Sequence, residues 1–269
     1  MRRTSLVGKR VVLTGALGGI GAASAEALRA GRAEVIGIDL GAGDGVIAAD
    51  ATDKEAIQGA IDEAAAVMGG IDILINNAGI GRAQDAGDFP NADVRAVIET
   101  NLFGAWNATA AALRYLLRSR GHIVNIASGL AVATVPYAAA YSASKRALAG
   151  YSDVLRMEYD RRLTVTVVHP GYIKTPIHDV AAESGASLQG LIREQSVDAA
   201  AAAIVRACTK RPREMATTRT LGVGLWFARH LPGVTSTAIT RGVRRHYLAN
   251  PRPTFVLEGE PEDVGVHSG

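Results

Sequence analysis

The sequence predicts a doubly wound α/β fold, with a parallel sheet of about seven strands and helices on both faces. Short apolar runs alternate with longer amphipathic segments along most of the chain. The runs contain few polar residues, as strands do when helices cover both faces of a parallel sheet. Glycine, asparagine or serine follows several of these runs directly, and such sheets bind ligands at the carboxyl ends of their strands.

The expected strands are the short apolar runs. They cover residues 11–13, 34–38, 46–49, 71–75, 121–126, 165–168 and 215–218. The expected helices follow them, ending near Ala30, covering 52–68 and 92–118, and carrying Tyr141 as far as Tyr159. We expect residues 1–269 to form a single domain, with residues 8–218 as its core and residues 219–269 as a C-terminal extension.

Composition excludes several classes of protein. The chain has 269 residues, of which 48% are hydrophobic and 20% charged, as in soluble globular proteins. Its one cysteine, Cys208, rules out an intramolecular disulfide and is expected in the core. The six histidines are scattered, so no metal site is predicted, and His122 and His169 are expected to be structural. Without a long apolar run, neither a secretory signal nor a membrane span is expected, and a cytoplasmic location is the default.

Positive charge gathers near the C-terminus. Residues 206–252 contain ten Lys or Arg and one acid, Glu214, although the whole chain carries only +3. The basic residues alternate with apolar ones and form no recognisable nucleic-acid module, so no nucleic-acid partner is expected. The apolar stretch 220–228 could cover a substrate cleft, pack on a partner subunit or lie weakly on an anionic membrane surface.

Tyr141 and Lys145 share one face if their segment is helical. A free phenol has a pKa of about 10, and a neighbouring ammonium favours the phenolate. The pair is therefore a candidate proton-transfer device in which Lys145 lowers the phenol pKa toward neutrality. Taken alone, the same spacing also fits a solvated helix face.

A glycine loop follows the first expected strand, with glycines at 15, 19 and 21. Backbone N–H groups and a helix N-terminus at this place favour a pyrophosphate. Asp39 ends the second strand, where a carboxylate can hydrogen-bond ribose hydroxyls and repel a 2′-phosphate. No Lys or Arg lies between Thr14 and Gly21 to offset that repulsion, which favours NAD over NADP. The alternative for Asp39 is a loop carboxylate that faces water.

Four motifs occur in one order along the chain. They are Thr14-Gly-x-x-x-Gly-Ile-Gly21, Asn76-Asn77-Ala78-Gly79, Tyr141-x-x-x-Lys145 and Pro170-Gly171. Together they resemble the short-chain dehydrogenase/reductase family of single-domain, nicotinamide-dependent oxidoreductases with a Rossmann fold. The resemblance covers roughly residues 8–218.

The resemblance implies a catalytic set of Asn101, Ser128, Tyr141 and Lys145. Ser128 lies 13 residues before Tyr141 and would hold the substrate oxygen. Tyr141 would act as general acid and base, while Lys145 would tune the phenol and bind the nicotinamide ribose. Asn101 would bend its helix and anchor a water next to the lysine.

The resemblance also implies contacts with cofactor and substrate. The expected cofactor-binding residues are Gly15, Leu17, Gly19, Ile20, Gly21, Asp39, Asp50, Ala51, Asn77, Ala78, Gly79, Tyr141, Lys145, Pro170, Gly171, Ile173 and Thr175. The expected substrate contacts are Ser128, Tyr137, Tyr141 and Tyr172. Asn77 would also brace the turn after the fourth strand. The loop 175–196 contains many apolar residues, and as a lid it favours a hydrophobic substrate.

We therefore expect an oxidoreductase that moves hydride between NAD(H) and a secondary alcohol or ketone, with a lipophilic skeleton such as a steroid or retinoid. One alternative is an NADPH-dependent carbonyl reductase, and another is a catalytically silent dinucleotide-binding scaffold. The complete catalytic set argues against the scaffold. A homodimer through the Asn101 and Tyr141 helices, or a homotetramer, is the expected assembly.

Overall fold

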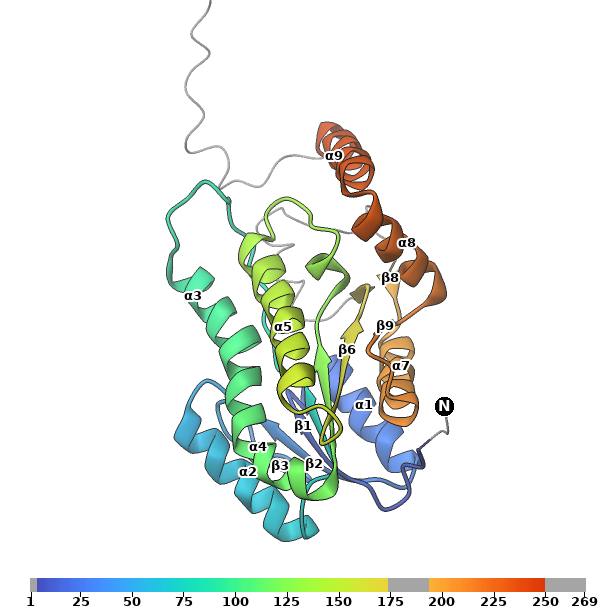
Figure 1. Cartoon of the computed structure of the whole chain (residues 1–269). Coiled ribbons are helices and arrows are strands. Elements are labelled where there is room, and N and C mark those ends of the chain that lie inside the picture. Colours follow the sequence, from blue (N-terminus) through green and yellow to red (C-terminus); the bar gives the residue numbers. More distant parts are fainter. Residues whose placement is uncertain (1–3, 174–193, 250–269) are drawn as a thin grey trace, which may run out of the picture.

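The computed structural model describes residues 4–173 and 194–249, and these form a three-layer α/β arrangement (Figure 1). Seven parallel strands lie in the order β3-β2-β1-β4-β5-β6-β9. They are β1 Arg10–Thr14, β2 Glu34–Asp39, β3 Val46–Ala48, β4 Ile73–Asn76, β5 His122–Ile126, β6 Thr164–His169 and β9 Glu214–Ala216. A separate parallel pair consists of β7 Tyr172–Ile173 and β8 Glu194–Gln195. The predicted seven-stranded parallel sheet is confirmed, although several strand ends differ from the predicted ones by one or two residues.

Helices cover both faces of the sheet. They are α1 Gly19–Ala30, α2 Lys54–Met68, α3 Ala92–Ile98, α4 Ala105–Ser119, α5 Ala139–Glu158, α7 Val197–Lys210, α8 Arg219–His230 and α9 Pro232–Ala249. The apolar side chains of α1 and α7 share one core cluster, and those of α2 and α4 share the other, which Leu155 of α5 joins. All residues of β4 and β5 are buried, and most of them are apolar, as expected for strands covered on both faces.

Two groups expected to be structural are confirmed as core residues. His122 is fully buried with Nε2 2.8 Å from the Thr166 hydroxyl, and burial lowers its pKa to about 3. Cys208 on α7 is buried too, and burial raises the pKa of its thiol to about 12. A thiol held neutral in this way is a poor nucleophile.

The helical region predicted over 92–118 is found over 92–119, but it is not α-helical throughout. A six-residue π-helical segment, Glu99–Gly104, separates α3 from α4. Asn101 lies inside it and is fully buried, with Oδ1 accepting from the Ile80 N–H at 2.8 Å. Its Nδ2 donates to the Ile80 carbonyl at 3.0 Å and to the Ser144 hydroxyl at 3.1 Å. These distant partners fix the π-helical turn, which the local helical pattern does not reveal.

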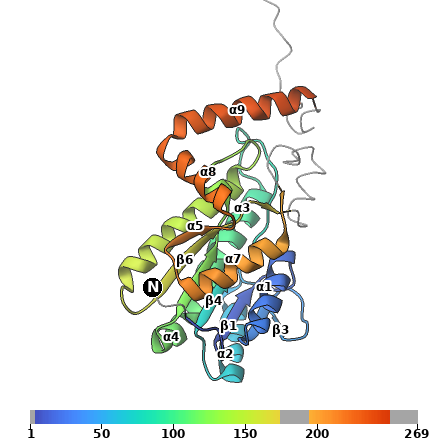
Figure 2. The same ribbon diagram turned by 90° about the vertical axis from the view of Figure 1, so that its right-hand side faces the viewer.

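The described part of the C-terminal extension, residues 219–249, forms two helices, α8 and α9, which we call the roof. The expected last strand over 215–218 ends earlier, at Ala216, because Thr218 caps α8 by accepting from the Leu221 N–H. Figure 2 shows α9 lying across the top of the molecule, beyond the carboxyl ends of the strands. No helix within 4–173 and 194–249 is long and apolar enough to cross a membrane.

Candidate active site

A cavity of about 1070 Å³ opens at the carboxyl ends of the central strands. One end is lined by the glycine loop and Asp39, and the other by Ser128, Tyr141 and Lys145. Parallel strands place their carboxyl ends at a common edge, so motifs far apart in sequence meet here. This volume is large enough to hold a dinucleotide and a second small molecule at the same time.

The glycine loop is shaped by two close backbone approaches. Gly15 has φ +67°, and a Cβ added there would lie 2.8 Å from the Ala78 Cα. A Cβ at Gly21 would lie 1.9 Å from the Gly15 carbonyl oxygen. Helix α1 begins after Gly18 without a side-chain cap and without an acid in its first turn. Its first N–H groups and positive dipole end therefore fit an anionic pyrophosphate.

Asp39 stands on the cavity wall with its carboxylate held by the backbone. Its Oδ2 accepts from the Leu17 N–H and its Oδ1 from the Leu40 N–H, each at 2.8 Å. Both hydrogen bonds lie at an exposed place, so the carboxylate is held in position while it still faces water. Leu17 itself lies outside the cavity lining, and its backbone N–H acts by holding Asp39.

Asn77 braces the turn after β4, as predicted. The Thr14 hydroxyl oxygen accepts from the N–H groups of Asn77 and Ala78, both at 3.1 Å. In return, the Asn77 amide donates to the carbonyl of Gly15 at 2.9 Å. These bonds join the turn after β4 to the glycine loop after β1, so the two loops hold one wall of the cavity together.

Ser128, Tyr141 and Lys145 meet at the other end of the cavity. Ser128 follows β5, and its hydroxyl accepts from the Leu130 N–H at 3.1 Å. Tyr141 and Lys145 lie on α5, with the ammonium 5.9 Å from the centre of the phenol ring. Lys145 Nζ also donates to the carbonyl of Ile126 at 3.0 Å. The pair thus faces the cavity, and a purely solvated helix face is excluded.

Burial controls the protonation of this pair. It raises the pKa of Tyr141, and a hydrogen bond with Ser128 lowers that pKa only in part. Burial also lowers the pKa of Lys145 to about 8. The expected fall of the phenol pKa toward neutrality is therefore wrong for the protein alone. Removal from water disfavours the charged form of both groups.

Asn101 acts one layer behind the cavity. It does not line the space, but it fixes the stretch after β4 through Ile80 and contacts α5 through Ser144. A Cβ at Gly79 would come within 2.9 Å of Asn101 Oδ1 and 3.1 Å of Lys145 Nζ. The glycine thus lets the amide and the ammonium pack against the same short stretch of backbone.

Most of the other predicted residues do line the cavity. These are Gly19, Ile20, Asp50, Ala51, Asn77, Ala78, Gly79, Pro170, Gly171, Tyr172 and Ile173. Tyr137 does not line it, so its prediction as a substrate contact is not supported; its carbonyl accepts from the Gln84 N–H at 3.2 Å. Thr175 and most of the expected apolar lid lie outside the described residues.

The roof supplies a large part of the cavity lining, and none of its residues was predicted individually as a substrate contact. Leu221, Gly224 and Leu225 of α8 line the cavity, as do Thr235, Ala238, Ile239 and Gly242 of α9. Leu130, Ala133 and Val135 complete an apolar wall next to Ser128. The only available signal was the apolar stretch 220–228, and of its three expected uses the structure supports cover for the cleft.

Comparisons with known proteins agree with this geometry. The family model described as short chain dehydrogenase matches residues 9–185. Dehydrogenase/reductase SDR family member 7B of Xenopus laevis is 37% identical over 175 residues, covering 62% of this chain and 54% of the relative. The chain thus spans about half the length of that curated relative.

Two solved structures have the same fold. The ligand-free aldohexose dehydrogenase of Thermoplasma acidophilum has a TM-score of 0.72 and 26% identity, covering 81% of this chain and 96% of that one. A short chain dehydrogenase from Burkholderia cenocepacia, in complex with NADP, has a TM-score of 0.68 and 30% identity. That match covers 79% of this chain and 97% of the other. The chain belongs to the short-chain dehydrogenase/reductase family of oxidoreductases.

Proposed function

We propose that the protein oxidises a lipophilic secondary alcohol, or reduces the matching ketone, with NAD(H) as cofactor. The observation that carries the proposal is the single cavity that joins the glycine loop and Asp39 to Ser128, Tyr141 and Lys145. The glycine loop and the N-terminus of α1 would hold the pyrophosphate. When bound, the nicotinamide ring would supply a hydride acceptor or donor.

Three side chains at the Ser128 end of the cavity have separate roles in moving the proton. The Ser128 hydroxyl holds the substrate oxygen beside the phenol of Tyr141. In reduction the Tyr141 phenol donates its proton to the substrate oxygen, and in oxidation the phenolate form of Tyr141 accepts the hydroxyl proton. The Lys145 ammonium contacts the Tyr141 ring and stabilises negative charge that develops on the phenol.

Asp39 supports a preference for NAD. Its carboxylate is fixed by two backbone N–H groups at the end of β2, where the adenosine ribose lies in Rossmann folds. A 2′-phosphate at this place would meet a negative charge. The Burkholderia relative was solved with NADP, so NADPH-dependent reduction is the competing proposal.

The walls beside Ser128 support a lipophilic substrate. Leu130, Val135, Leu221, Leu225 and Ile239 offer hydrocarbon surface to whatever binds there. A sugar would have to give up hydrogen bonds to water against such walls, at a cost for each unpaired hydroxyl. The aldohexose dehydrogenase that shares the fold makes a sugar the natural comparison substrate.

A screen of purified protein tests the proposal. Steroid, cyclic and aliphatic secondary alcohols, with an aldohexose for comparison, are offered with NAD and NADP at equal concentration, and reduced nicotinamide is followed by absorbance. We expect turnover of at least one lipophilic alcohol, faster with NAD. Faster reaction with NADP would overturn the cofactor preference, and turnover of the aldohexose alone would overturn the substrate class.

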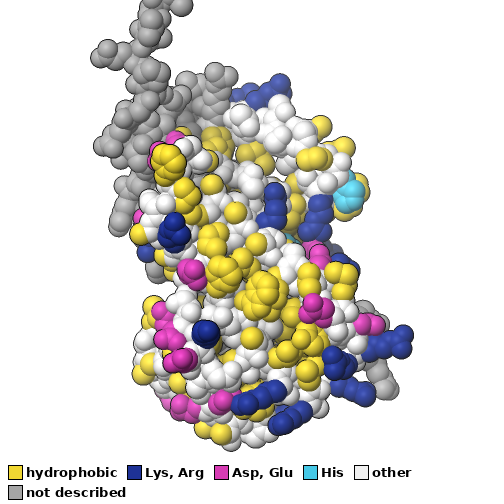
Figure 3. All heavy atoms as spheres, turned by 60° about the vertical axis from the view of Figure 1, so that its left-hand side comes forward, with side chains coloured by type: hydrophobic (Ala, Val, Ile, Leu, Met, Phe, Trp, Pro, Cys, Tyr) yellow, Lys and Arg dark blue, Asp and Glu magenta, His cyan; other side chains and the backbone are white. Residues whose placement is uncertain are grey.

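We also propose that two copies of the chain pair through α4 and α5. Hydrophobic side chains gather on this face of the molecule (Figure 3). Trp106 stacks on Tyr151 with ring centres 4.2 Å apart, and Phe103, Val154 and Met157 are exposed beside them. Trp106→Asp is expected to halve the mass measured by light scattering. An unchanged mass would rule this face out.

Weak contact of the roof with an anionic membrane surface is a further proposal about partners. Apolar side chains are exposed on α8, between the two helices and on α9, at Trp226, Phe227, Leu231 and Val234. Arg219 of α8 and Arg241 of α9 are exposed too. Apolar side chains can enter the interface while arginines attract anionic lipid. Salt-sensitive binding to phosphatidylserine vesicles is expected, and absence of binding at low salt would remove the proposal.

A further inference from the structure

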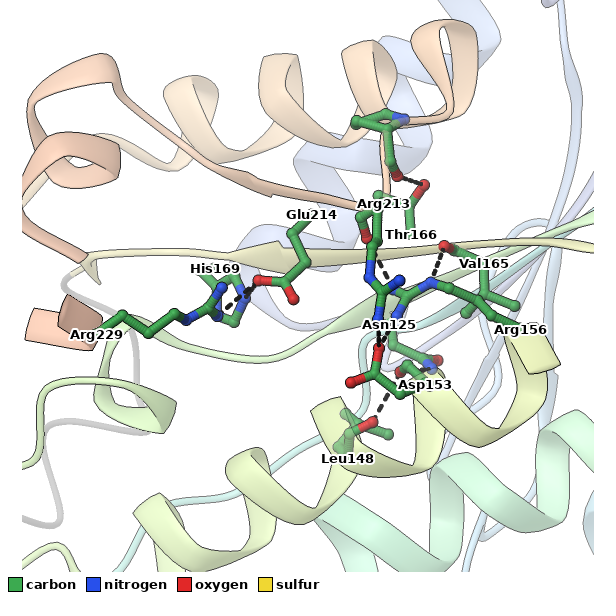
Figure 4. A network of polar contacts seen from close by, with 12 residues as sticks. Asn125, Leu148, Asp153, Arg156, Val165, Thr166, His169, Arg213, Glu214 and Arg229 are labelled. Atoms are coloured by element: carbon green, nitrogen blue, oxygen red, sulfur yellow. Dashed lines mark hydrogen bonds and ion pairs between the residues drawn. The ribbon is translucent and has the colours of Figure 1, made fainter. Parts of the chain in front are cut away.

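Behind Ser128, three ionisable side chains from three separate elements form a line, which we call the ion chain. His169 ends β6 and is almost fully buried, with Nδ1 3.0 Å from the backbone carbonyl oxygen of Ser128. Its Nε2 lies 3.2 Å from Oε2 of Glu214 on β9. Arg229 of α8 donates to that same Oε2 at 2.7 Å. Figure 4 shows His169, Glu214 and Arg229 pointing toward one another.

The hydrogen-bond partners of His169 determine which of its ring nitrogens must carry protons. A backbone carbonyl accepts hydrogen bonds and cannot donate them, and neither can an ionised carboxylate. The hydrogen bond from His169, followed by that from Arg229, lowers the pKa of Glu214 to about 2, so its carboxylate is ionised. The imidazole therefore serves both neighbours at once only with a proton on each ring nitrogen. If the imidazole carried a single proton, the ring nitrogen without it would face the lone pair of an oxygen, either of Ser128 or of Glu214, with no hydrogen between them.

The ion chain ends on the backbone that carries the active-site serine. Ser128 is followed by a short turn, in which the Gly129 N–H donates to the Pro170 carbonyl at 2.7 Å. The Leu130 N–H donates to the Ser128 hydroxyl at 3.1 Å. A bond to the Ser128 carbonyl oxygen therefore fixes the peptide plane next to the Cα that carries the hydroxyl. His169 does not itself line the cavity, so its effect on chemistry passes through Ser128, which does.

Helix α8 contacts this serine turn in a second way. Leu221 and Leu225 line the cavity, and their side chains come close to Gly129. Arg229 lies one further turn along the same helix and holds Glu214. One helix thus covers the substrate space with apolar side chains and anchors the ion chain with a cation.

We propose that His169, Glu214 and Arg229 are positioning residues that orient Ser128 and make its orientation depend on the placement of α8 over the cavity. A substrate of the right size beneath Leu221 and Leu225 supports α8. The supported helix keeps Arg229 on Glu214, and His169 keeps the Ser128 carbonyl fixed while the hydroxyl holds the substrate oxygen. The inference deepens the proposed function and rests on it.

Arg229→Met tests the link, because this side chain is half-exposed and its loss leaves the core intact. We expect kcat for a lipophilic alcohol to fall about 10-fold, as a misplaced reacting group causes, with NADH affinity unchanged. Arg229→Lys restores a cation and is expected to recover most of the rate. Arg219→Met, at the exposed start of the same helix, is the matched control and should behave as the unmodified protein.

Hydrogen exchange gives a readout that does not depend on turnover. In Arg229→Met, the amides of Gly129 and Leu130 should exchange faster than in the unmodified protein and in Arg219→Met, with the melting temperature little changed. A folded Arg229→Met protein with normal kcat and normal exchange at these amides would overturn the inference. If the unmodified protein turns over no alcohol, the proposed function fails, while exchange in the variants still decides whether the ion chain holds the serine turn.

Discussion

The core of the sheet and the roof that covers it are held in very different ways. Every residue of β5 is buried, whereas Ala228 is the one buried residue of α8. On α9 the described side chains include one buried apolar residue, Val243, while Val234 is 67% exposed. The groups proposed for chemistry thus sit on the tightly packed part, and much of the surface proposed to select the substrate sits on the lightly packed part. Reaction type and substrate range should therefore respond separately to mutation.

The largest expected effect comes from the packed region. Tyr141→Phe removes the hydroxyl that exchanges a proton with the substrate and leaves the ring in place. We expect kcat to fall about a thousand-fold, in the range of general acid–base catalysis, with NADH binding unchanged in a fluorescence titration. Near-normal turnover would assign the chemistry elsewhere and favour a dinucleotide-binding scaffold.

A second test asks how rigid the packed region is. Gly15→Ala forces a positive φ on an L-residue and a Cβ against the Ala78 backbone. We expect a loss of about 1–3 kcal/mol in the free energy of unfolding, together with weaker NADH binding.

Gly59→Ala is the matched control for Gly15→Ala. Gly59 lies in α2 with nothing within 4 Å of an added Cβ, so alanine should stabilise the helix by about 0.5–1 kcal/mol. Urea denaturation of both variants measures the contrast. Equal free energies of unfolding in the two variants would show that the glycine loop can accommodate a Cβ at Gly15 without strain.

The roof should show the opposite response. Leu225→Ala shortens a side chain that lines the cavity on a helix with few buried contacts. We expect KM for a lipophilic alcohol to rise about 10-fold, while the melting temperature changes little. Val223→Ala, on an exposed part of the same helix, is the control. A fall in kcat at constant KM would show that Leu225 does not contribute to substrate binding and affects the rate only through the placement of α8.

A smaller effect is expected where roof and core join. Burial opposes ionisation of Glu214, but His169 and Arg229 hold its folded-state pKa at about 2, below the ordinary 4.5. The resulting stabilisation is complete above about pH 4.5 and is lost as pH falls toward 2. Glu214→Gln should therefore flatten the decline of melting temperature across this acid range. Glu63→Gln, on an exposed part of α2, should leave that decline unchanged, and a decline unaltered in both variants would contradict the assignment.

Sequence was informative wherever structure follows from local pattern. The succession of strands along the chain, the glycine loop, Asp39 and the Tyr141–Lys145 pair could be predicted because each motif directly follows a recognisable strand or repeats on one helix face. The roles of Ser128, Asp50 and Ala51 followed from the resemblance to the family, and all three line the cavity.

What sequence could not reveal depends on partners distant along the chain. The contacts of His169 lie 41 and 45 residues away, at Ser128 and Glu214, so a lone histidine after a strand gave no sign of them. Burial raises the pKa of the Tyr141 phenol, and local spacing does not report burial. The cavity-lining role of Leu221 and Leu225 likewise depends on how α8 folds back over the sheet.

Because of the π-helical segment Glu99–Gly104, the number of residues in this helical region should matter more for activity than the identity of its exposed residues. A π turn accommodates one residue more than an α turn, so deleting one residue from it would allow an unbroken α-helix. Each residue of an α-helix turns the chain by about 100°, so such a deletion would rotate one side of the helix against the other by about that angle. Asn101 would then lose Ile80 or Ser144, while many substitutions at exposed positions nearby would leave both contacts in place. A scan of single deletions across residues 92–119 should therefore find lost activity even where every substitution is tolerated.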